Sequence, residues 1–341
     1  MEDRVHNPVT RLDFQPPAWL KNPHTQSVMA SSKLRLKKIA GDLAPMKAAS
    51  RPLLLDGGEA QLLGYLSSPE PGRPLVILLH GWEGSGESVY LQSAAAWLYR
   101  KGYAVLRLHL RDHGDSHHLN RDLFHSCRDP EVTRAILHAR DRIDAPSCQL
   151  IGFSLGGSFA LRSALGCEQA GRPLDSVISV CPPLEPKHTL HAMQTGPAIY
   201  HYYFMRKWRR SLLRKNNCHP GLCPPDQWRH FGRMDQLTDY FVREHSDFGD
   251  LDRYFSGYAL TGERLAGMTT SATLLMSEDD PICLARDLDR TRLGPGTEVF
   301  LTRHGGHCGF IDHLGLDNWL NRQLLDWLQA QCPAAPGPSG D

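Results

Sequence analysis

The sequence QLIGFSLGG, residues 149–157, joins a short apolar run to a helix-forming run through a single serine. The run before the serine is typical of a strand buried on both faces of a parallel sheet, and residues 155–165 follow with helical spacing. Ser154 lies between Gly152 and Gly156, which matches the G-x-S-x-G pattern of a sharp strand-to-helix turn. Such a turn needs small residues on either side, because neighbouring backbone approaches closely there. The stretch therefore predicts an α/β sheet and makes Ser154 a candidate nucleophile.

Strand-like and helix-like runs alternate on both sides of this stretch. Apolar runs predict strands at residues 51–56, 60–66, 74–80, 103–108, 175–180, 272–276 and 298–301. Helical spacing predicts helices at residues 87–101, 130–143 and 316–330. We expect Gly102 to follow the first of these, Asp129 to be the N-cap of the second, and Gly166 to end the helix that begins at Leu155. This alternation indicates a doubly wound, mostly parallel twisted sheet with helices on both faces.

The alternation stops between residues 182 and 268, where His, Tyr, Trp, Arg and Pro are frequent. We expect residues 182–268 to form a helical cap inserted into a core made of residues 51–181 and 269–331, because loops at the carboxyl ends of the strands build the site in open α/β sheets. Residues 1–50 contain several prolines and are expected to form an arm on the core. The Pro/Gly-rich residues 332–341 are expected to be a disordered tail.

The composition is that of a globular protein, with 41% hydrophobic and 22% charged residues among 341 and a formal net charge of +1. So small a net charge argues against nucleic acid as a partner. Nine cysteines without a CxxC pair favour reduced thiols and a cytoplasmic location. No apolar run reaches the roughly 18 residues of a membrane span, so any membrane contact is expected to be peripheral. The basic cluster within residues 206–215 is interpreted as a solvated helix face, with a surface for anionic lipid or substrate as the alternative.

The run His80-Gly81-Trp82 follows the predicted strand at residues 74–80. In enzymes with a serine turn of this kind, the loop at that place supplies one backbone N–H of an oxyanion hole, and the residue after the nucleophile supplies the other. This assigns the oxyanion hole to the backbone N–H groups of Trp82 and Leu155. Each such donor lowers the barrier by roughly 3 kcal/mol.

The other two members of a catalytic triad are expected after the last two core strands. His307 lies in the glycine-rich run GGHCGF, from which an imidazole can reach the serine, and His304 is the competing candidate. The acid is expected in the run SEDDP, where the proline favours extended geometry for Asp280 and can direct it to the histidine. Alternatively, Asp280 caps a helix and leaves Asp279 or Glu278 for the histidine. A neutral imidazole must accept the serine proton, so activity is expected to rise over about pH 6 to 7.

Together these motifs resemble those of the α/β-hydrolases, and among them the YheT-like branch of the AB hydrolase 4 type. The resemblance covers residues 15–330 and includes NPHTQ at 22–26, HGWEGS at 80–85 and GFSLGG at 152–157, followed by DDP and GGHCGF. It implies the α/β-hydrolase fold and a serine hydrolase that cleaves carboxylic esters through an acyl-enzyme, with Ser154, His307 and Asp280 as the triad. It also implies no cofactor, no metal and a small-molecule ester substrate. RDHG at 111–114 departs from the R-G-x-G of the branch, and no apolar run supplies the membrane anchor of its lipid-cleaving relatives, so only ester hydrolysis in general carries over. An apolar acyl group is expected from the aromatic run at residues 199–205.

Two other functions and one structural alternative stay open. The histidine-rich turn of residues 109–118 has spacing near that of a metal site, so a metal-dependent hydrolase is one alternative. A binding protein without catalysis on a hydrolase fold is another. The aromatic run at residues 199–205 suits either an acyl-binding wall or the interior of the cap.

Overall fold

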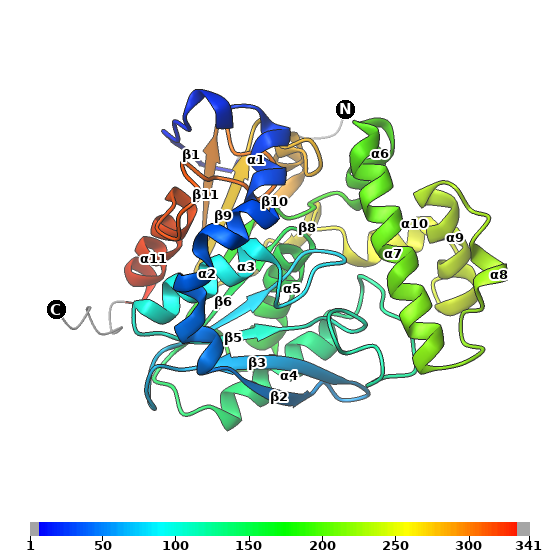
Figure 1. Cartoon of the computed structure of the whole chain (residues 1–341), viewed down its shortest axis with the longest axis horizontal. Coiled ribbons are helices and arrows are strands. Elements are labelled where there is room, and N and C mark those ends of the chain that lie inside the picture. The colour runs from blue at the N-terminus through cyan, green and yellow to red at the C-terminus, as the bar shows by residue number, and fades with distance from the viewer. Residues whose placement is uncertain (1–6, 333–341) are drawn as a thin grey trace.

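The computed structural model describes residues 7–332, and the predicted tail at 333–341 lies outside the described residues. Its centre is a nine-stranded sheet in the order β1-β11-β9-β7-β6-β4-β5-β3-β2, shown in Figure 1. Neighbouring strands run parallel except at one edge, where β3 is antiparallel to both β5 and β2. The strands of this sheet are β1 (Val9–Leu12), β2 (Arg51–Asp56), β3 (Gln61–Ser67), β4 (Leu75–Leu79), β5 (Ala104–Leu108), β6 (Cys148–Phe153), β7 (Ser176–Val180), β9 (Ala272–Ser277) and β11 (Thr297–Thr302).

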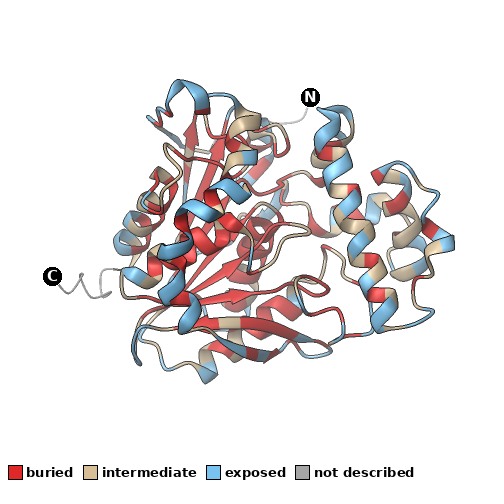
Figure 2. Ribbon diagram, viewed as in Figure 1, coloured by how far each residue is buried: buried red, intermediate tan, exposed pale blue. Residues whose placement is uncertain are grey.

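Helices cover both faces of the sheet, as the alternating pattern predicted. One face packs against α4 (Asp129–Arg142) and α5 (Leu155–Gln169), and the other against α2 (Lys33–Ala48), α3 (Val89–Arg100) and α11 (Trp319–Gln331). Alternate residues of β4 serve the two sides, since Ile77 belongs to the first apolar cluster and Leu78 to the second. Figure 2 shows the strands buried between these layers. The result is a doubly wound, mostly parallel α/β sheet.

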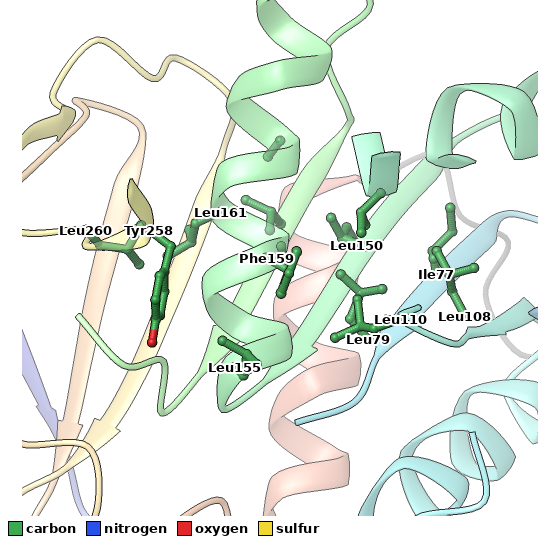
Figure 3. Packing of buried hydrophobic residues seen from close by; sticks show 14 of the residues in the cluster. Ile77, Leu79, Leu108, Leu110, Leu150, Leu155, Phe159, Leu161, Tyr258 and Leu260 are labelled. Atoms are coloured by element: carbon green, nitrogen blue, oxygen red, sulfur yellow. The ribbon is translucent and has the colours of Figure 1, made fainter. Parts of the chain in front are cut away.

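Side chains of α5 fill the space between that helix and the middle strands (Figure 3). Phe159 points toward Leu150 of β6 and Leu161 points to the other side of α5, toward Tyr258, and all are buried in one apolar cluster. Burial of a large apolar side chain contributes about 1.5–3 kcal/mol, so this layer holds the start of α5 firmly against the carboxyl end of β6. The turn that carries Ser154 therefore stands on a rigid base.

The segment after β7 leaves the sheet and forms helices that lie to one side of it in Figure 1. These are α6 (Pro186–Thr195), α7 (Ala198–Cys218), α8 (Pro225–Trp228), α9 (Met234–His245) and α10 (Leu251–Tyr258). The segment also contains β8 (Gly262–Leu265), which pairs with β10 (Thr291–Leu293) in a separate two-stranded sheet, although no strand was expected before residue 268. The short η2 (Ala285–Arg290) precedes β10.

The N-terminal residues are more regular than the expected arm. β1 extends the sheet by pairing in parallel with β11, and η1 (Ala18–Leu20), α1 (Pro23–Ala30) and α2 follow. The side chain of Asn22 accepts hydrogen bonds from the backbone N–H groups of His24 and Thr25, so the NPHTQ run begins α1 with a capped N-terminus.

Two predicted helix boundaries were wrong. Asp129 is the first residue of α4 and not its N-cap, because its carboxylate instead accepts from Arg162 Nη1 at 2.6 Å. Gly166 does not end α5, which continues to Gln169. A Cβ at Gly166 would lie 2.9 Å from the Thr133 hydroxyl, so this glycine allows α4 and α5 to approach each other.

Candidate active site

Ser154 occupies the sharp turn between β6 and α5. Its φ of +55° lies in the left-handed region, which is strained for a residue with a Cβ. The flanking glycines permit the turn: a Cβ at Gly152 would lie 2.1 Å from the Gly156 carbonyl oxygen, and one at Gly156 would lie 2.5 Å from that of His80. The G-x-S-x-G spacing thus reflects contacts in which no side chain fits.

The structure brings Ser154, His307 and Asp280 together from three separate loops. Ser154 Oγ lies 2.8 Å from His307 Nε2, and His307 Nδ1 lies 2.9 Å from Asp280 Oδ2. The Asp280 side chain is fully buried, and 12% of the His307 side chain is exposed. The alternative histidine, His304, is 3.5 Å from the carboxylate of Asp279. This arrangement can move a proton from the serine hydroxyl to an imidazole that a carboxylate orients.

The sequence suggested two alternative roles for Asp280, orienting the histidine and capping the start of a helix, and its side chain makes both kinds of contact. Oδ1 of Asp280 accepts from the backbone N–H groups of Ile282 and Cys283 at 2.8 and 2.9 Å, while Oδ2 faces His307. Asp279 has a different task, because its Oδ1 accepts from the backbone N–H of Gly306 at 2.8 Å. One aspartate therefore orients the imidazole, and the other holds the loop on which the imidazole is carried.

The electrostatic surroundings favour the protonated form of His307. Burial is the largest single influence and lowers the pKa of this imidazole, but the Asp280 carboxylate together with Cys308 and Cys283 outweighs burial and raises the pKa well above its ordinary value of 6.5. An imidazolium formed when the serine loses its proton is stabilised in the same way.

Among residues 81–84 of the loop after β4, one backbone N–H is left without an acceptor in the described part of the protein. The Gly81 N–H donates to Tyr90 Oη, that of Glu83 to His113 Nε2, and that of Gly84 to the Gly81 carbonyl. Within residues 7–332, the Trp82 N–H donates to no protein atom.

The N–H of Leu155, the first residue of α5, is likewise unpaired among the described residues, as expected at the start of a helix. A Cβ at Gly81 would lie 3.1 Å from that of Ser154, so the loop lies directly against the serine. Both predicted oxyanion donors are thus free to bind an oxygen.

The histidine-rich turn supports this loop. His113 accepts the Glu83 N–H at Nε2, so its Nδ1 carries the proton and donates to the Arg111 carbonyl at 2.7 Å. Burial lowers the pKa of His113 to about 3, so the ring stays neutral and remains an acceptor. Arg111 itself is paired with Glu131. RDHG, the run that departs from the expected R-G-x-G, therefore contains a side chain, that of His113, which fixes the residue next to Trp82.

Helix α1 holds the loop that carries His307, a role that the sequence analysis did not assign. Ser27 Oγ accepts the backbone N–H of His307 at 2.8 Å. The fully buried Gln26 donates to the Ile311 carbonyl and accepts the Ile311 N–H, at 2.9 and 3.0 Å. A Cβ at Gly306 would lie 2.2 Å from the Pro23 carbonyl oxygen. The sequence signal that could have indicated this role was the NPHTQ run, because it belongs to the motifs of the YheT-like branch and yet lies far from the triad in the chain.

A cavity of about 640 Å³ opens beside Ser154 and His307. Core and α6–α10 residues both line it, and most of the lining side chains are apolar, among them Met193, Phe204, Trp208, Phe255 and Tyr258. Trp82 stacks on Phe204 with ring centroids 5.5 Å apart. An apolar pocket that ends at an activated serine can hold an apolar group next to the reacting atom.

Side chains with metal-binding atoms also meet near His307. In the described part of the chain, two groups bring three such atoms within 4.8 Å of one another: Cys181, His307 and Cys308, and Asp280, Cys283 and His307. The histidines of residues 109–118 belong to neither group. All nine cysteines are free thiols.

None of the helices within residues 7–332 combines the length and the apolar character that crossing a membrane would require.

Comparison with known proteins agrees with this architecture. A family model for the alpha/beta hydrolase fold matches residues 74–220. The chain is 25% identical over 288 residues to "Putative esterase YheT" of Escherichia coli strain K12, covering 81% of this chain and 83% of that protein. It is 40% identical to the Xenopus tropicalis sn-1-specific diacylglycerol lipase ABHD11 over 96 residues, 28% of each chain. The crystal structure of the Pyrococcus furiosus esterase Pf2001 aligns with a TM-score of 0.57 at 15% identity, covering 86% of this chain and 93% of the other. The chain therefore has the α/β-hydrolase fold, and its sequence is similar to that of the Escherichia coli YheT protein.

Proposed function

We propose that this protein is a serine esterase that cleaves carboxylic esters through an acyl-enzyme. The observation that carries the proposal is the continuous contact from Ser154 Oγ to His307 Nε2 and from His307 Nδ1 to Asp280 Oδ2, at 2.8 and 2.9 Å. A serine hydroxyl is a weak nucleophile until a neighbouring base removes its proton, and this arrangement supplies the base.

The first half of the reaction forms the acyl-enzyme. Ser154 Oγ attacks the ester carbonyl while His307 Nε2 accepts the hydroxyl proton, and the carbonyl oxygen becomes an oxyanion held by the N–H groups of Trp82 and Leu155. The C–O bond to the alcohol then breaks, and His307 returns the proton to the leaving alcohol. In the second half, water attacks the acyl carbon with His307 again as base, and the acid and free Ser154 are released.

The cavity favours esters whose acyl or alcohol part is apolar. The wall beside Ser154 consists largely of aromatic and aliphatic side chains, with Phe204 and Trp208 of α7 next to Trp82. The relatives named above are an esterase and a diacylglycerol lipase, which supports ester substrates of this kind. A cytoplasmic location stays a prediction from the free thiols.

Pre-steady-state hydrolysis of p-nitrophenyl acetate tests the proposal. The wild type should release a burst of p-nitrophenol equal to the enzyme concentration, followed by slower turnover. Ser154→Ala should lose the burst and the turnover. Ser163→Ala is the matched control, because Ser163 is another buried α5 serine and does not line the cavity. A wild type that binds esters but shows neither a burst nor turnover would be the binding protein of the alternative reading.

A further inference from the structure

Helix α7 exposes one continuous stripe of side chains. The α7 stripe consists of Ile199, Tyr202, Tyr203, Arg206, Arg210 and Arg214, all exposed to solvent. These positions recur every three or four residues, so they lie on one side of the helix. Figure 2 shows exposed positions along the length of this helix. The stripe is divided, with apolar and aromatic side chains in its N-terminal half and arginines in its C-terminal half.

The charge of this helix is one-sided. α7 contains six basic residues and no acidic residue along its 21 positions. Lys215 is buried against Asp112, whereas Arg206, Arg210 and Arg214 make no ion pair with any residue in the described range 7–332. The chain as a whole has a formal net charge of only +1, so these arginines form a local positive surface.

The apolar half of the stripe adjoins the entrance to the active-site cavity. Ile199 and Tyr203 line the cavity and yet are 60% and 46% exposed, and Tyr202 beside them is 66% exposed. Val28 of α1, which is 49% exposed, lines the same cavity. Large apolar side chains at a cavity entrance are costly to leave in water unless a partner covers them.

We propose that the α7 stripe docks on the surface of an anionic lipid bilayer. The tyrosines and Ile199 enter the headgroup boundary, where amphipathic rings are favoured, and Arg206, Arg210 and Arg214 pair with anionic headgroups. Docking in this orientation places the cavity entrance at the bilayer, so that an apolar ester passes from the lipid to Ser154 without crossing water. The delivery of substrate rests on the proposed esterase function, whereas the docking itself does not.

A bilayer fits the stripe better than a protein partner does. Arginine side chains can lay their apolar stems on a surface while the charged ends reach the headgroups. A second copy of the chain with its α7 parallel would place arginines against arginines, and an antiparallel copy would still offer the arginines no acidic residue of α7. An acidic protein partner remains an outcome that the experiment separates.

Co-sedimentation of the full chain with vesicles tests the docking without relying on catalysis. The wild type should bind vesicles of phosphatidylcholine with 30% phosphatidylglycerol at low salt, and much more weakly at high salt or with phosphatidylcholine alone, because ions screen the attraction over about 10 Å at 0.1 M. Each basic residue near an anionic surface contributes roughly fivefold, so Arg206→Glu/Arg210→Glu/Arg214→Glu should weaken binding by at least about 100-fold, because the glutamates also add repulsion. Tyr202→Ser should weaken it by a smaller factor.

Arg51→Glu/Arg134→Glu/Arg286→Glu is the matched control. It makes the same change in net charge at exposed positions on β2, α4 and η2, whose arginines form no ion pair with any residue from 7 to 332. This control should bind vesicles nearly as well as the wild type. Circular dichroism of all variants checks that each is folded. Hydrolysis of soluble p-nitrophenyl acetate should be unchanged in the α7 triple variant, while hydrolysis of an ester dissolved in anionic vesicles should fall.

Several results would overturn the docking proposal. A wild type that stays in the supernatant with anionic vesicles at low salt contradicts it, and so does an equal loss in the α7 and control variants. A wild-type dimer that the α7 substitutions dissociate, without vesicle binding, would assign the stripe to a second copy. If no ester is hydrolysed but the wild type binds vesicles through α7, the docking stands and the proposed esterase function fails.

Discussion

At the scale of single residues, Asp280 combines two contacts that the sequence presented as alternatives. Because it both orients His307 and accepts the N–H groups of Ile282 and Cys283, its loss should affect catalysis and stability together. An asparagine can still accept the backbone N–H groups, but it does not supply the negative charge. We expect Asp280→Asn to lower kcat by on the order of 10⁴ while lowering the free energy of unfolding by only about 1 kcal/mol.

Asp279→Asn is the control for this substitution. Asp279 accepts the Gly306 N–H, and an asparagine oxygen can accept the same bond. Steady-state kinetics on p-nitrophenyl acetate should therefore show a mild effect at Asp279. A severe loss at Asp279 with a mild one at Asp280 would transfer the role of triad acid to Asp279.

The pKa of His307 moves the expected pH dependence away from the ordinary imidazole range. The base must be neutral to accept the Ser154 proton, so activity is lost as the pH falls through the pKa of His307 in the folded enzyme. Since Asp280 raises that pKa well above 6.5, the ascending limb of kcat/KM should lie above the pH 6 to 7 expected from the sequence. In Asp280→Asn the residual activity should have its limb at lower pH. A wild-type limb at or below pH 6.5 would show that burial, and not Asp280, controls this imidazole.

At the scale of elements, α1 is part of the active site although it begins more than 100 residues before Ser154. Gln26→Leu removes both hydrogen bonds to Ile311 and leaves a buried N–H and a buried carbonyl without partners, which costs about 1–3 kcal/mol per group. We expect a lower melting temperature and a lower kcat, because the same loop carries His307.

Gln236→Leu, at an exposed position of α9, is the matched control and should change neither quantity. If Gln26→Leu lowers the melting temperature but leaves kcat and the pH profile of the remaining folded enzyme intact, α1 stabilises the fold without positioning the histidine.

Local patterns predicted those elements whose cause is local. The strands from β2 to β7 are short apolar runs, and the serine turn is specified by glycines within two residues of Ser154. β1 was not predictable in this way, because its four residues are largely exposed and become a strand only by pairing with β11 almost 300 residues later. The predicted end of α5 at Gly166 was wrong for a similar reason. This glycine lies inside the helix and makes room for Thr133 of α4, a contact that no local pattern shows.

The candidate site likewise contains residues that a local pattern predicts and contacts that it does not. Ser154, His307 and the two oxyanion donors lie in runs whose chemistry can be recognised within six residues. The contacts of Gln26 and Ser27 with the histidine loop, and that of His113 with Glu83, join segments far apart in the chain. Such pairs leave no periodic signal in one sequence, so they appear only when the fold brings them together.

At the scale of the whole molecule, one buried lysine ties α7 to the core. Lys215 Nζ donates to Asp112 Oδ1 at 2.7 Å and to the Asn120 carbonyl at 2.6 Å, and only 1% of the Lys215 side chain is exposed. Burial raises the pKa of Asp112 even though Lys215 acts to lower it. The packing of α7 on the core thus depends on a pair of charges that would be costly to separate.

We expect Lys215→Met to lower the free energy of unfolding by about 3–5 kcal/mol, because it leaves the Asp112 carboxylate buried without its partner. The double variant with Asp112→Asn should recover part of this loss, since asparagine tolerates the φ of +59° found at Asp112. Lys38→Met, at an exposed position of α2, is the control. Denaturant unfolding measures all three, and a loss at Lys215 no larger than at Lys38 would contradict the anchoring role.

The central claim is that Ser154 is an activated nucleophile, and covalent labelling tests it most directly. A fluorophosphonate reacts with a serine only when a base and an oxyanion site assist the attack. Mass spectrometry of the folded wild type should show a single adduct, on the peptide that contains Ser154, and Ser154→Ala should show none. Absence of an adduct in the folded wild type, or an adduct on another residue, would contradict the account.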